Sequence, residues 1–240
     1  MRSLAAVFAL FAAGAGAVCA PSAEAQAQGQ TTPVVVEFFT SQGCSACPPA
    51  DALFGELARR PGVIALALHV DYWDYLGWKD AFALPENTAR QRAYAKAHRS
   101  RTIYTPQIIV QGADMIVGHE TDTILDRIEA HRRAPMPVTL EVARRGGVVE
   151  IALAPSARPV GAAEVHVVRF IPSHTMTIGG GENAGIRHDY VNVVSEWRTI
   201  GRWDGSTDAE MAHEAGGGDP LAVIVQAVRN GPVLAAAALP

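Results

Sequence analysis

Cysteine is scarce in this sequence: the 240 residues contain three, and two of these, Cys44 and Cys47, stand three positions apart. So few cysteines exclude a small scaffold held together by several disulfides. Aromatic residues (7%) and charged residues (18%) are also few, whereas hydrophobic residues reach 49%. Because that apolar content is ample for a buried core, we predict a globular protein whose cysteine pair serves a local purpose.

Basic residues are outnumbered by acidic ones, 20 to 24, and the formal net charge is −4 at pH 7. Proteins that bind nucleic acid usually carry a basic face, so nucleic acid is not an expected partner. Residues 178–185 are rich in glycine but lack a following helix at the spacing of a phosphate-binding loop. We interpret that stretch as a turn or an interdomain loop, and we expect no dissociable cofactor.

Long hydrophobic runs are missing beyond the N-terminus, so no membrane span is expected in the rest of the chain. The N-terminus has Arg2, an apolar stretch and small residues that suit cleavage after Ala25 or Ala27, which is the layout of a secretory signal peptide. Residues 16–18 lack the large aliphatic residue that lipid attachment to Cys19 would require. We therefore expect residues 1–25 to be removed and the mature protein to be periplasmic or secreted, in an oxidising space.

Strand-like and helical stretches alternate between residues 31 and 134. Short apolar runs rich in β-branched and aromatic residues predict strands buried on both faces, and apolar residues at helical spacing predict helices. These segments are strands at 33–39 and 62–70, helices at 47–60, 85–99 and 120–133 (the last capped at Thr121 or Asp122), and a hairpin at 106–118 around Gly112. Because a βαβ unit implies a parallel pair, the prediction is an α/β domain with a mixed sheet, βαβ plus ββα.

The pattern changes after Pro135 and Pro137, which we interpret as a linker. Residues 138–240 show almost no helical spacing and contain runs with a period of two, separated by turns that carry glycine or proline. These runs are 138–142, 148–153, 163–170, 190–194, 221–228 and 233–239. They predict a second domain, 138–240, that is an all-β antiparallel sandwich of six or seven strands.

The cysteine pair lies where the first predicted strand ends and its helix begins. Free N–H groups and the helix dipole favour an anion at such a junction, so we expect Cys44 to be the thiolate-forming nucleophile. Cys47 follows one helical turn later, and we expect it to be buried and to resolve a mixed disulfide by attacking Cys44. A pair with this spacing after a strand of a βαβ unit is typical of a redox motif.

Two other interpretations of the pair stay open. One is a static disulfide, although so short a loop restrains the unfolded chain very little. The other is half of a zinc site, which would need further Cys or His ligands at metal spacing, whereas the eight histidines are scattered.

The stretch "IYTPQIIV" places Pro106 before a predicted strand, at the same end of the sheet as the cysteines. A cis bond can turn the chain sharply there, while an ordinary trans proline opening an edge strand is the alternative. In these features the sequence resembles the thioredoxin superfamily. The resemblance implies that a cis Pro106 faces the cysteine pair and that Thr105 offers backbone hydrogen bonds to an incoming peptide.

Four separated motifs narrow the resemblance: "VVVEFFTSQGCSACPPAD", "ALHVDYWDYLGWKDAFA", "YTPQIIVQG" and "YVNVVSEWRTIGRWDG". They are similar to one family of bacterial secreted proteins, catalogued as domain of unknown function 1223 within the thioredoxin-like group. The similarity extends over essentially the whole mature chain. It implies a fold and export, but no activity.

Further polar and aromatic residues are candidates for the site. Glu37 interrupts an apolar strand, and its desolvated carboxyl would suit proton exchange with the resolving thiol; a salt-bridged or edge-strand glutamate is the alternative. His69 ends the second strand, where it could stabilise the Cys44 thiolate or be an ordinary strand-end histidine. The aromatic residues that follow suit a peptide groove or core packing equally well, and they are Tyr72, Trp73, Tyr75 and Trp78.

Together these features predict an exported thiol–disulfide oxidoreductase that acts on protein or peptide disulfides, with catalytic residues Cys44, Cys47, Thr105, Pro106 and Glu37. Its partners would be protein thiols or disulfides and a redox partner that the sequence does not identify. One alternative is a Cu(I)-binding or metallochaperone module that uses the two thiolates. Another is an interaction module without enzymatic activity, and the oligomeric state is not determined by the sequence.

Overall fold

The computed structural model describes residues 33–240, and these form three α-helices, one 3-10 helix and eleven strands. The helices are α1 (Pro48–Leu57), α2 (Pro85–Ala97), α3 (Thr121–Arg133) and the 3-10 helix η1 (Asp74–Leu76). The strands are β1 (Val34–Thr40), β2 (Val63–His69), β3 (Gln107–Val110), β4 (Asp114–Val117), β5 (Val138–Arg145), β6 (Val148–Pro155), β7 (Ala163–Thr177), β8 (Arg187–Trp203), β9 (Ala209–Glu214), β10 (Leu221–Ala227) and β11 (Val233–Leu239). The predicted signal peptide, residues 1–25 with Cys19, lies outside the described residues.

The parallel βαβ unit predicted from the sequence is present. β1 and β2 pair in parallel, from Val34 beside Val63 to Thr40 beside His69. Every residue of β1 is buried, as its unbroken apolar character predicts. Strand side chains alternate between faces, so β1 contributes to two separate cores.

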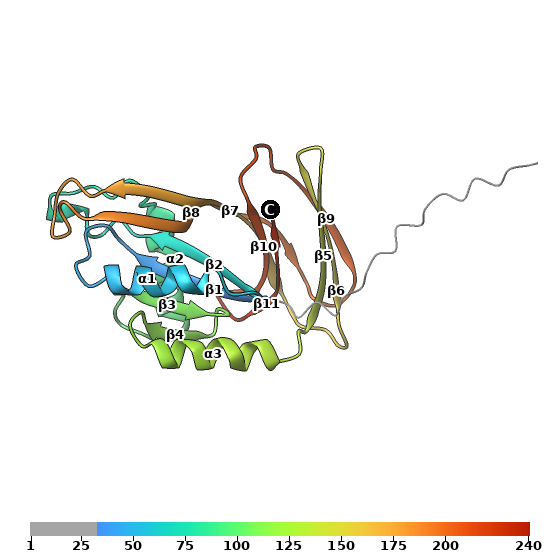
Figure 1. Ribbon diagram of the computed structural model, residues 1–240. Coiled ribbons are helices and arrows are strands. Elements are labelled where there is room, and N and C mark those ends of the chain that lie inside the picture. Colours follow the sequence, from blue (N-terminus) through green and yellow to red (C-terminus); the bar gives the residue numbers. More distant parts are fainter. Residues whose placement is uncertain (1–32) are drawn as a thin grey trace, which may run out of the picture. The chain divides into compact units, whose positions relative to one another are not determined.

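Helices cover both faces of this part of the sheet. On one face, Val36 and Phe38 of β1 pack with Phe54 of α1 and Ile124 of α3. On the other face, residues of β1 pack with Tyr94 of α2 and with side chains of the later strands β7, β8, β10 and β11. The sheet is thus covered by α1 and α3 on one face and by α2 on the other, as in a layered α/β arrangement (Figure 1).

The predicted hairpin and closing helix are also present. β3 runs antiparallel to β1, and β4 runs antiparallel to β3. The turn between them includes Gly112, whose φ of +66° favours glycine. The N-cap of α3 is Glu120 and not Thr121 or Asp122, so the predicted cap is off by one or two positions.

Eight strands form one mixed sheet in the order β11-β10-β7-β8-β2-β1-β3-β4. The strands of the second half join those of the first through β8, which pairs in parallel with β2 at Ala67 and Val193. The long hairpin of β7 and β8 carries most of this extension (Figure 1). A single sheet thus runs through both of the ranges that the sequence predicts as domains, 31–134 and 138–240.

A second, three-stranded antiparallel sheet has the order β5-β6-β9. Its apolar residues pack against β7, β10 and β11 of the larger sheet in a shared core that includes Val149, Val165 and Val223. The second half is therefore rich in antiparallel strands, as predicted, but one layer of its sandwich belongs to the larger sheet. β9 has no counterpart among the predicted strands.

Candidate functional site

Three neighbouring strands of the larger sheet each have one terminus at the same edge: β1 and β2 end there, and β3 begins there. Thr40, the last residue of β1, pairs with His69, the last residue of β2. β3 runs antiparallel to β1 with Gln107 beside Phe39, which places Pro106 next to Thr40. The cysteine loop follows β1 directly, so the cysteines, the end of β2 and the proline share one end of the sheet, as the sequence predicts.

The loop between β1 and α1 is a succession of turns. The N–H of Cys44 donates to the carbonyl of Ser41 at 3.1 Å, and the N–H of Cys47 donates to the carbonyl of Cys44 at 3.1 Å. Cys47 is the N-cap residue of α1, and Pro48 occupies the first helical position, where its missing N–H costs no hydrogen bond. The helix therefore begins after the second cysteine, and Cys44 lies one turn before it.

Cys44 and Cys47 are joined by a disulfide, and their Cα atoms are 5.4 Å apart. Cys47 is fully buried and Cys44 is only 2% exposed. Ser45 and Ala46 between them are exposed. The two cysteines therefore do not differ in exposure in this oxidised state, although only Cys47 was expected to be buried.

Trp73 connects the cysteine loop with the residue before the proline. Its Nε1 donates to Oγ1 of Thr105 at 2.7 Å. At the other end of the side chain, its Cβ would lie 3.1 Å from a methyl group placed on Gly43. The peptide bond between Thr105 and Pro106 is cis, which is the state implied by the resemblance and not the trans alternative.

His69 is directed to an aspartate of the segment that follows β2. Its Nδ1 lies 2.7 Å from Oδ2 of Asp80, and both side chains are fully buried. Burial alone would raise the pKa of Asp80, but the interaction with His69 together with hydrogen bonds from the backbone N–H groups of Gln42 and Phe82 lowers the pKa below its usual value. Within the described residues, Nε2 of His69 has no hydrogen-bond partner, so no hydrogen bond joins His69 to the disulfide.

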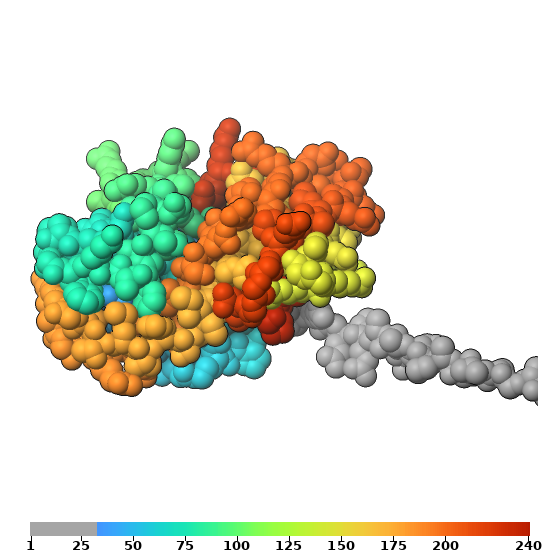
Figure 2. Space-filling model, turned by 90° about the horizontal axis from the view of Figure 1, so that it is seen from above, coloured from blue at the N-terminus to red at the C-terminus, as the bar shows by residue number. Residues whose placement is uncertain are grey.

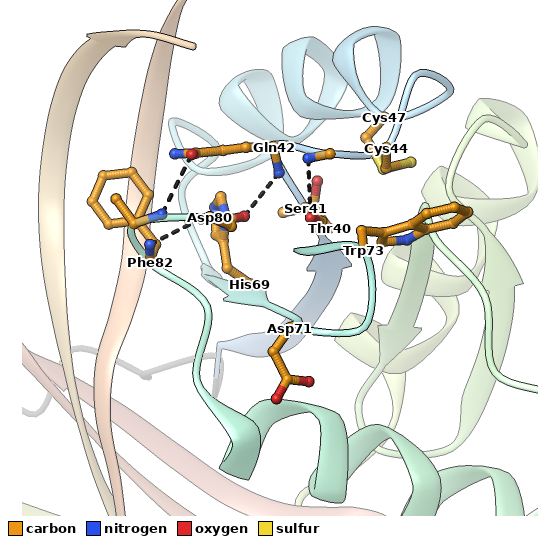
Figure 3. Close-up of polar contacts among 12 residues, drawn as sticks. Thr40, Ser41, Gln42, Cys44, Cys47, His69, Asp71, Trp73, Asp80 and Phe82 are labelled. Carbon is orange, nitrogen blue, oxygen red and sulfur yellow. Dashed lines mark hydrogen bonds and ion pairs between the residues drawn. A yellow bond between two sulfur atoms is a disulfide. The ribbon is translucent and has the colours of Figure 1, made fainter. Parts of the chain in front are cut away.

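The cysteine loop is fixed from two directions, and Figure 3 shows the contact of Gln42 with Asp80. The N–H of Gln42 donates to Asp80 at 2.8 Å, and the Gln42 side-chain oxygen accepts a hydrogen bond from Nε1 of Trp78 at 2.7 Å. From the other side, Nδ2 of Asn183 donates to the carbonyls of Gln42 and Cys44, each at 2.9 Å. These contacts order the backbone around the first cysteine.

Asn183 belongs to the glycine-rich stretch 178–185, which forms the turn of the β7–β8 hairpin. A methyl group on Gly179 would lie 2.6 Å from Cζ3 of Trp78, and one on Gly180 would lie 3.1 Å from the carbonyl oxygen of Gly77. The glycines therefore let the hairpin approach the segment after β2, and Figure 2 shows that segment (teal) against the hairpin (gold). The stretch is a turn and not an interdomain loop.

The other predicted aromatic residues divide between core and surface. Tyr72 and Trp73 pack against the core on the α2 side of the sheet. Tyr75 is 76% exposed. This short segment thus combines side chains that pack against the core with one that is exposed.

Glu37 is not brought to the cysteines. It is fully buried and lies on the face of β1 that packs against α2, whereas α1 covers the other face. Its two carboxylate oxygens accept hydrogen bonds from Nε and Nη2 of Arg90 at 2.6 and 2.7 Å, and one also accepts from the Tyr94 hydroxyl at 2.5 Å. Glu37 is therefore a salt-bridged glutamate, which is one of the alternatives considered for it from the sequence.

Asp51 is the carboxylate nearest to the pair along α1, and it is not among the residues predicted from the sequence. Its N–H donates to the carbonyl of Cys47 at 2.9 Å, so the two side chains have the i,i+4 spacing of neighbours on one helix face. Its Oδ1 accepts a hydrogen bond from Oγ1 of Thr40 at 3.1 Å, and Nε2 of His188 lies 4.0 Å from Oδ2. Burial raises the pKa of Asp51 from 3.8 to about 7. The four-residue spacing from Cys47 is the signal that could have identified it.

Neither a cluster suited to bind a metal ion nor a helix suited to cross a membrane is present within the described residues, 33–240. No group of three or more His, Cys, Asp or Glu side chains there is arranged to hold a metal ion. None of the helices in that range is long and apolar enough to cross a membrane.

The solved structures that resemble this chain include two that match it over most of its length. Protein AGR_C_4864 from Agrobacterium tumefaciens is 33% identical, with a TM-score of 0.73 over 86% of this chain and 93% of that one. HBP35 of Porphyromonas gingivalis is 13% identical, with a TM-score of 0.58 over 87% of this chain and 74% of that one, a likeness of fold alone. No curated protein matches the chain with significance.

The family assignment rests on a match over most of the sequence. The model of the family described as "Protein of unknown function (DUF1223)" matches residues 35–226. This range includes the cysteine loop, Thr105–Pro106, the segment after β2 and the β7–β8 hairpin. The chain belongs to the DUF1223 family.

Proposed function

We propose that this protein is an exported thiol–disulfide oxidoreductase that acts on protein or peptide substrates through Cys44 and Cys47. The observation that carries the proposal is the disulfide between these residues at the end of β1, level with Pro106. A thioredoxin-like core is part of the proposal. It is supported by the strand order β2-β1-β3-β4, the parallel β1–β2 pair and the helix that follows the cysteines.

The reaction is an exchange between sulfur atoms. A client thiolate attacks Sγ of Cys44, the Cys44–Cys47 bond breaks, and Cys47 leaves as a thiolate. A second client thiolate then attacks the client sulfur of this mixed disulfide and releases Cys44. The client loses two electrons, the pair gains them, and an external disulfide partner restores the starting state; the reverse sequence reduces a client disulfide.

Thr105 and Pro106 are assigned to the orientation of the client. In this proposal the backbone of Thr105 binds an extended client chain, and the ring of Pro106 excludes other hydrogen-bond donors from the neighbourhood of the disulfide. The register of β3 against β1 supports this assignment, because it brings both residues to the end of β1 that carries the cysteines.

The proton of the Cys47 thiol is assigned to Asp51 and not to Glu37. Glu37 is engaged by Arg90 on the opposite face of β1. Asp51 lies one turn beyond Cys47 on the same helix, and its pKa of about 7 suits proton exchange near neutral pH. Export is supported by the N-terminal residues 1–25, whose composition is that of a signal peptide.

Trapping of mixed disulfides tests the proposal. In Cys47→Ser, the thiol of Cys44 can form a disulfide with a client but no second thiol can resolve it, so client adducts should accumulate. Cys44→Ser is the matched control and should accumulate few. Both variants are exported with their signal peptide, and adducts are separated on non-reducing gels and identified by mass spectrometry.

Equal trapping by the two variants, or no adducts with either, would contradict the assignment. In the first case the two thiols would be equivalent, and in the second the disulfide would be a static link within the loop.

A further inference from the structure

The disulfide is buried although the two residues between its cysteines are exposed. Ser45 and Ala46 are exposed, yet Cys44 is 2% exposed and Cys47 is fully buried. Thiol–disulfide exchange needs an approach to one sulfur atom, so whatever shields the sulfurs also controls which thiols react.

Trp73 is placed to provide that shield. Its Cβ packs against Gly43, which directly precedes Cys44, and its indole Nε1 donates to Oγ1 of Thr105. The side chain therefore extends from the cysteine loop to the residue before Pro106. Figure 3 shows the indole on the same side of the loop as the sulfur atoms.

The contacts that hold the indole of Trp73 are few, so contacts with a bound client can replace them. Trp73 and Thr105 are both only partly buried, and a single hydrogen bond fixes the outer end of the indole. Trp73 is the N-cap of the three-residue helix η1, in a segment between β2 and α2 with no other regular structure. Gly77 ends η1 with a φ of +92°, and no atom lies within 4 Å of a methyl group placed on it, so there is free space at the Cβ position of this glycine.

We propose that Trp73 determines the specificity of the cysteine pair for polypeptide clients. While no client is bound, the indole shields the disulfide and occupies Thr105. An extended polypeptide gains enough contacts along the site to displace the indole, whereas a small thiol gains too few. That the client is a polypeptide rests on the proposed function. The shielding of the disulfide by the indole can be tested with a small thiol, without a polypeptide client.

Reduction kinetics of the oxidised, full-length mature protein test this inference. One reductant is glutathione: its thiolate attacks a sulfur of the pair, and a second glutathione releases oxidised glutathione and the reduced pair. The other is a reduced, unfolded polypeptide. Because exchange rates depend on access to the sulfur, Trp73→Ala should accelerate reduction by glutathione at least about tenfold and change the polypeptide rate much less.

Three variants refine the test. Trp73→Phe keeps a ring but loses the hydrogen bond, and Thr105→Val loses the acceptor but keeps its shape. Each should accelerate the glutathione reaction by less than Trp73→Ala. Tyr75→Ala removes an exposed aromatic side chain from the same segment and should leave both rates unchanged.

A glutathione rate for Trp73→Ala within about twofold of the unsubstituted protein would overturn the inference, since access to the sulfurs would not depend on the indole. If Trp73→Ala does not fold by circular dichroism, Trp73→Phe and Thr105→Val decide: acceleration in both supports the shield, and none in either overturns it. Failure of the polypeptide to react even with the unsubstituted protein would instead count against the proposed function.

Discussion

At the scale of single residues, two buried carboxylates of this protein differ in what surrounds them. Glu37 accepts hydrogen bonds from Arg90 and Tyr94, so its charge is compensated inside the protein. Asp51 has a hydrogen bond from Thr40 and a histidine 4.0 Å away, and burial dominates its pKa. Burial therefore disfavours the ionised form of Asp51, whose pKa is raised to about 7, whereas Glu37 is held in an ion pair with Arg90.

Asp51→Asn should stabilise the protein at neutral pH. The pKa of Asp51 rises from 3.8 to about 7 on folding, so the folded state holds the proton more tightly, and stability is lost as the pH rises through this interval. One pKa unit corresponds to about 1.4 kcal/mol, so the full cost of ionisation above pH 7 is about 4 kcal/mol. The neutral asparagine avoids this cost. Urea unfolding of both proteins between pH 4 and pH 8 measures it.

The difference between the two proteins isolates Asp51, because the facing groups His69, Asp80, His188 and Tyr190 are present in both. It should be small at pH 4 and largest at pH 8. A difference that does not change with pH would show that Asp51 does not titrate as described.

At the scale of elements, the β7–β8 hairpin forms part of the site although it is far from the cysteines in the sequence. Its turn supplies Asn183, which binds two carbonyls of the cysteine loop. Its glycines leave room for Trp78, which in turn holds Gln42. The loop that carries Cys44 is thus ordered in part by an element more than 130 residues away, since Asn183 and Cys44 are separated by 139 positions.

Asn183→Ala should destabilise the protein by about 1–3 kcal/mol, because it removes the side-chain donor of the Gln42 carbonyl and one of the two donors of the Cys44 carbonyl. The amides of residues 41–47 should also exchange with solvent faster. Glu182→Ala changes the neighbouring, exposed residue and is the matched control. Urea unfolding and hydrogen exchange measure the two effects, and equal stability of the two variants would mean that the hairpin turn does not hold the loop.

At the scale of the whole described chain, the two sequence halves share one core. The cluster on the α2 side of the sheet combines Val35 and Leu66 of the first half with Phe170, Ile224 and Val233 of the second. Residues 31–240 also form one compact unit by their contacts. Stability is therefore a property of both halves together.

Residues 31–134 alone should not unfold cooperatively. Separation from the later strands exposes one face of β1 and β2, and each large side chain that loses its burial costs about 1.5–3 kcal/mol. Several such losses exceed the 5–15 kcal/mol that a domain typically has. Thermal unfolding followed by circular dichroism compares this fragment with residues 31–240; a sharp transition in the fragment would contradict the shared core.

Local sequence patterns predicted the helices and strands. Features that depend on contacts between residues far apart in the sequence could not be predicted from it. The apolar run 33–39, the helix after Cys47 and the hairpin at Gly112 are confirmed, since each follows from the properties of neighbouring residues. The pairing of β8 with β2 could not be predicted, because it rests on a short parallel contact, Ala67 beside Val193, for which no local signal selects a partner. For the same reason the contacts of Trp73 with Thr105 and of Asn183 with Cys44 emerged only from the structure.

The equilibrium reduction potential of the Cys44–Cys47 disulfide tests the central claim most directly. It is measured by incubating the mature protein in glutathione buffers of graded ratio, then alkylating free thiols and weighing the protein by mass spectrometry. A redox-active pair should titrate reversibly within the range of known thiol–disulfide oxidoreductases, about −270 to −120 mV. A potential below about −300 mV, as found for structural disulfides, would contradict the account.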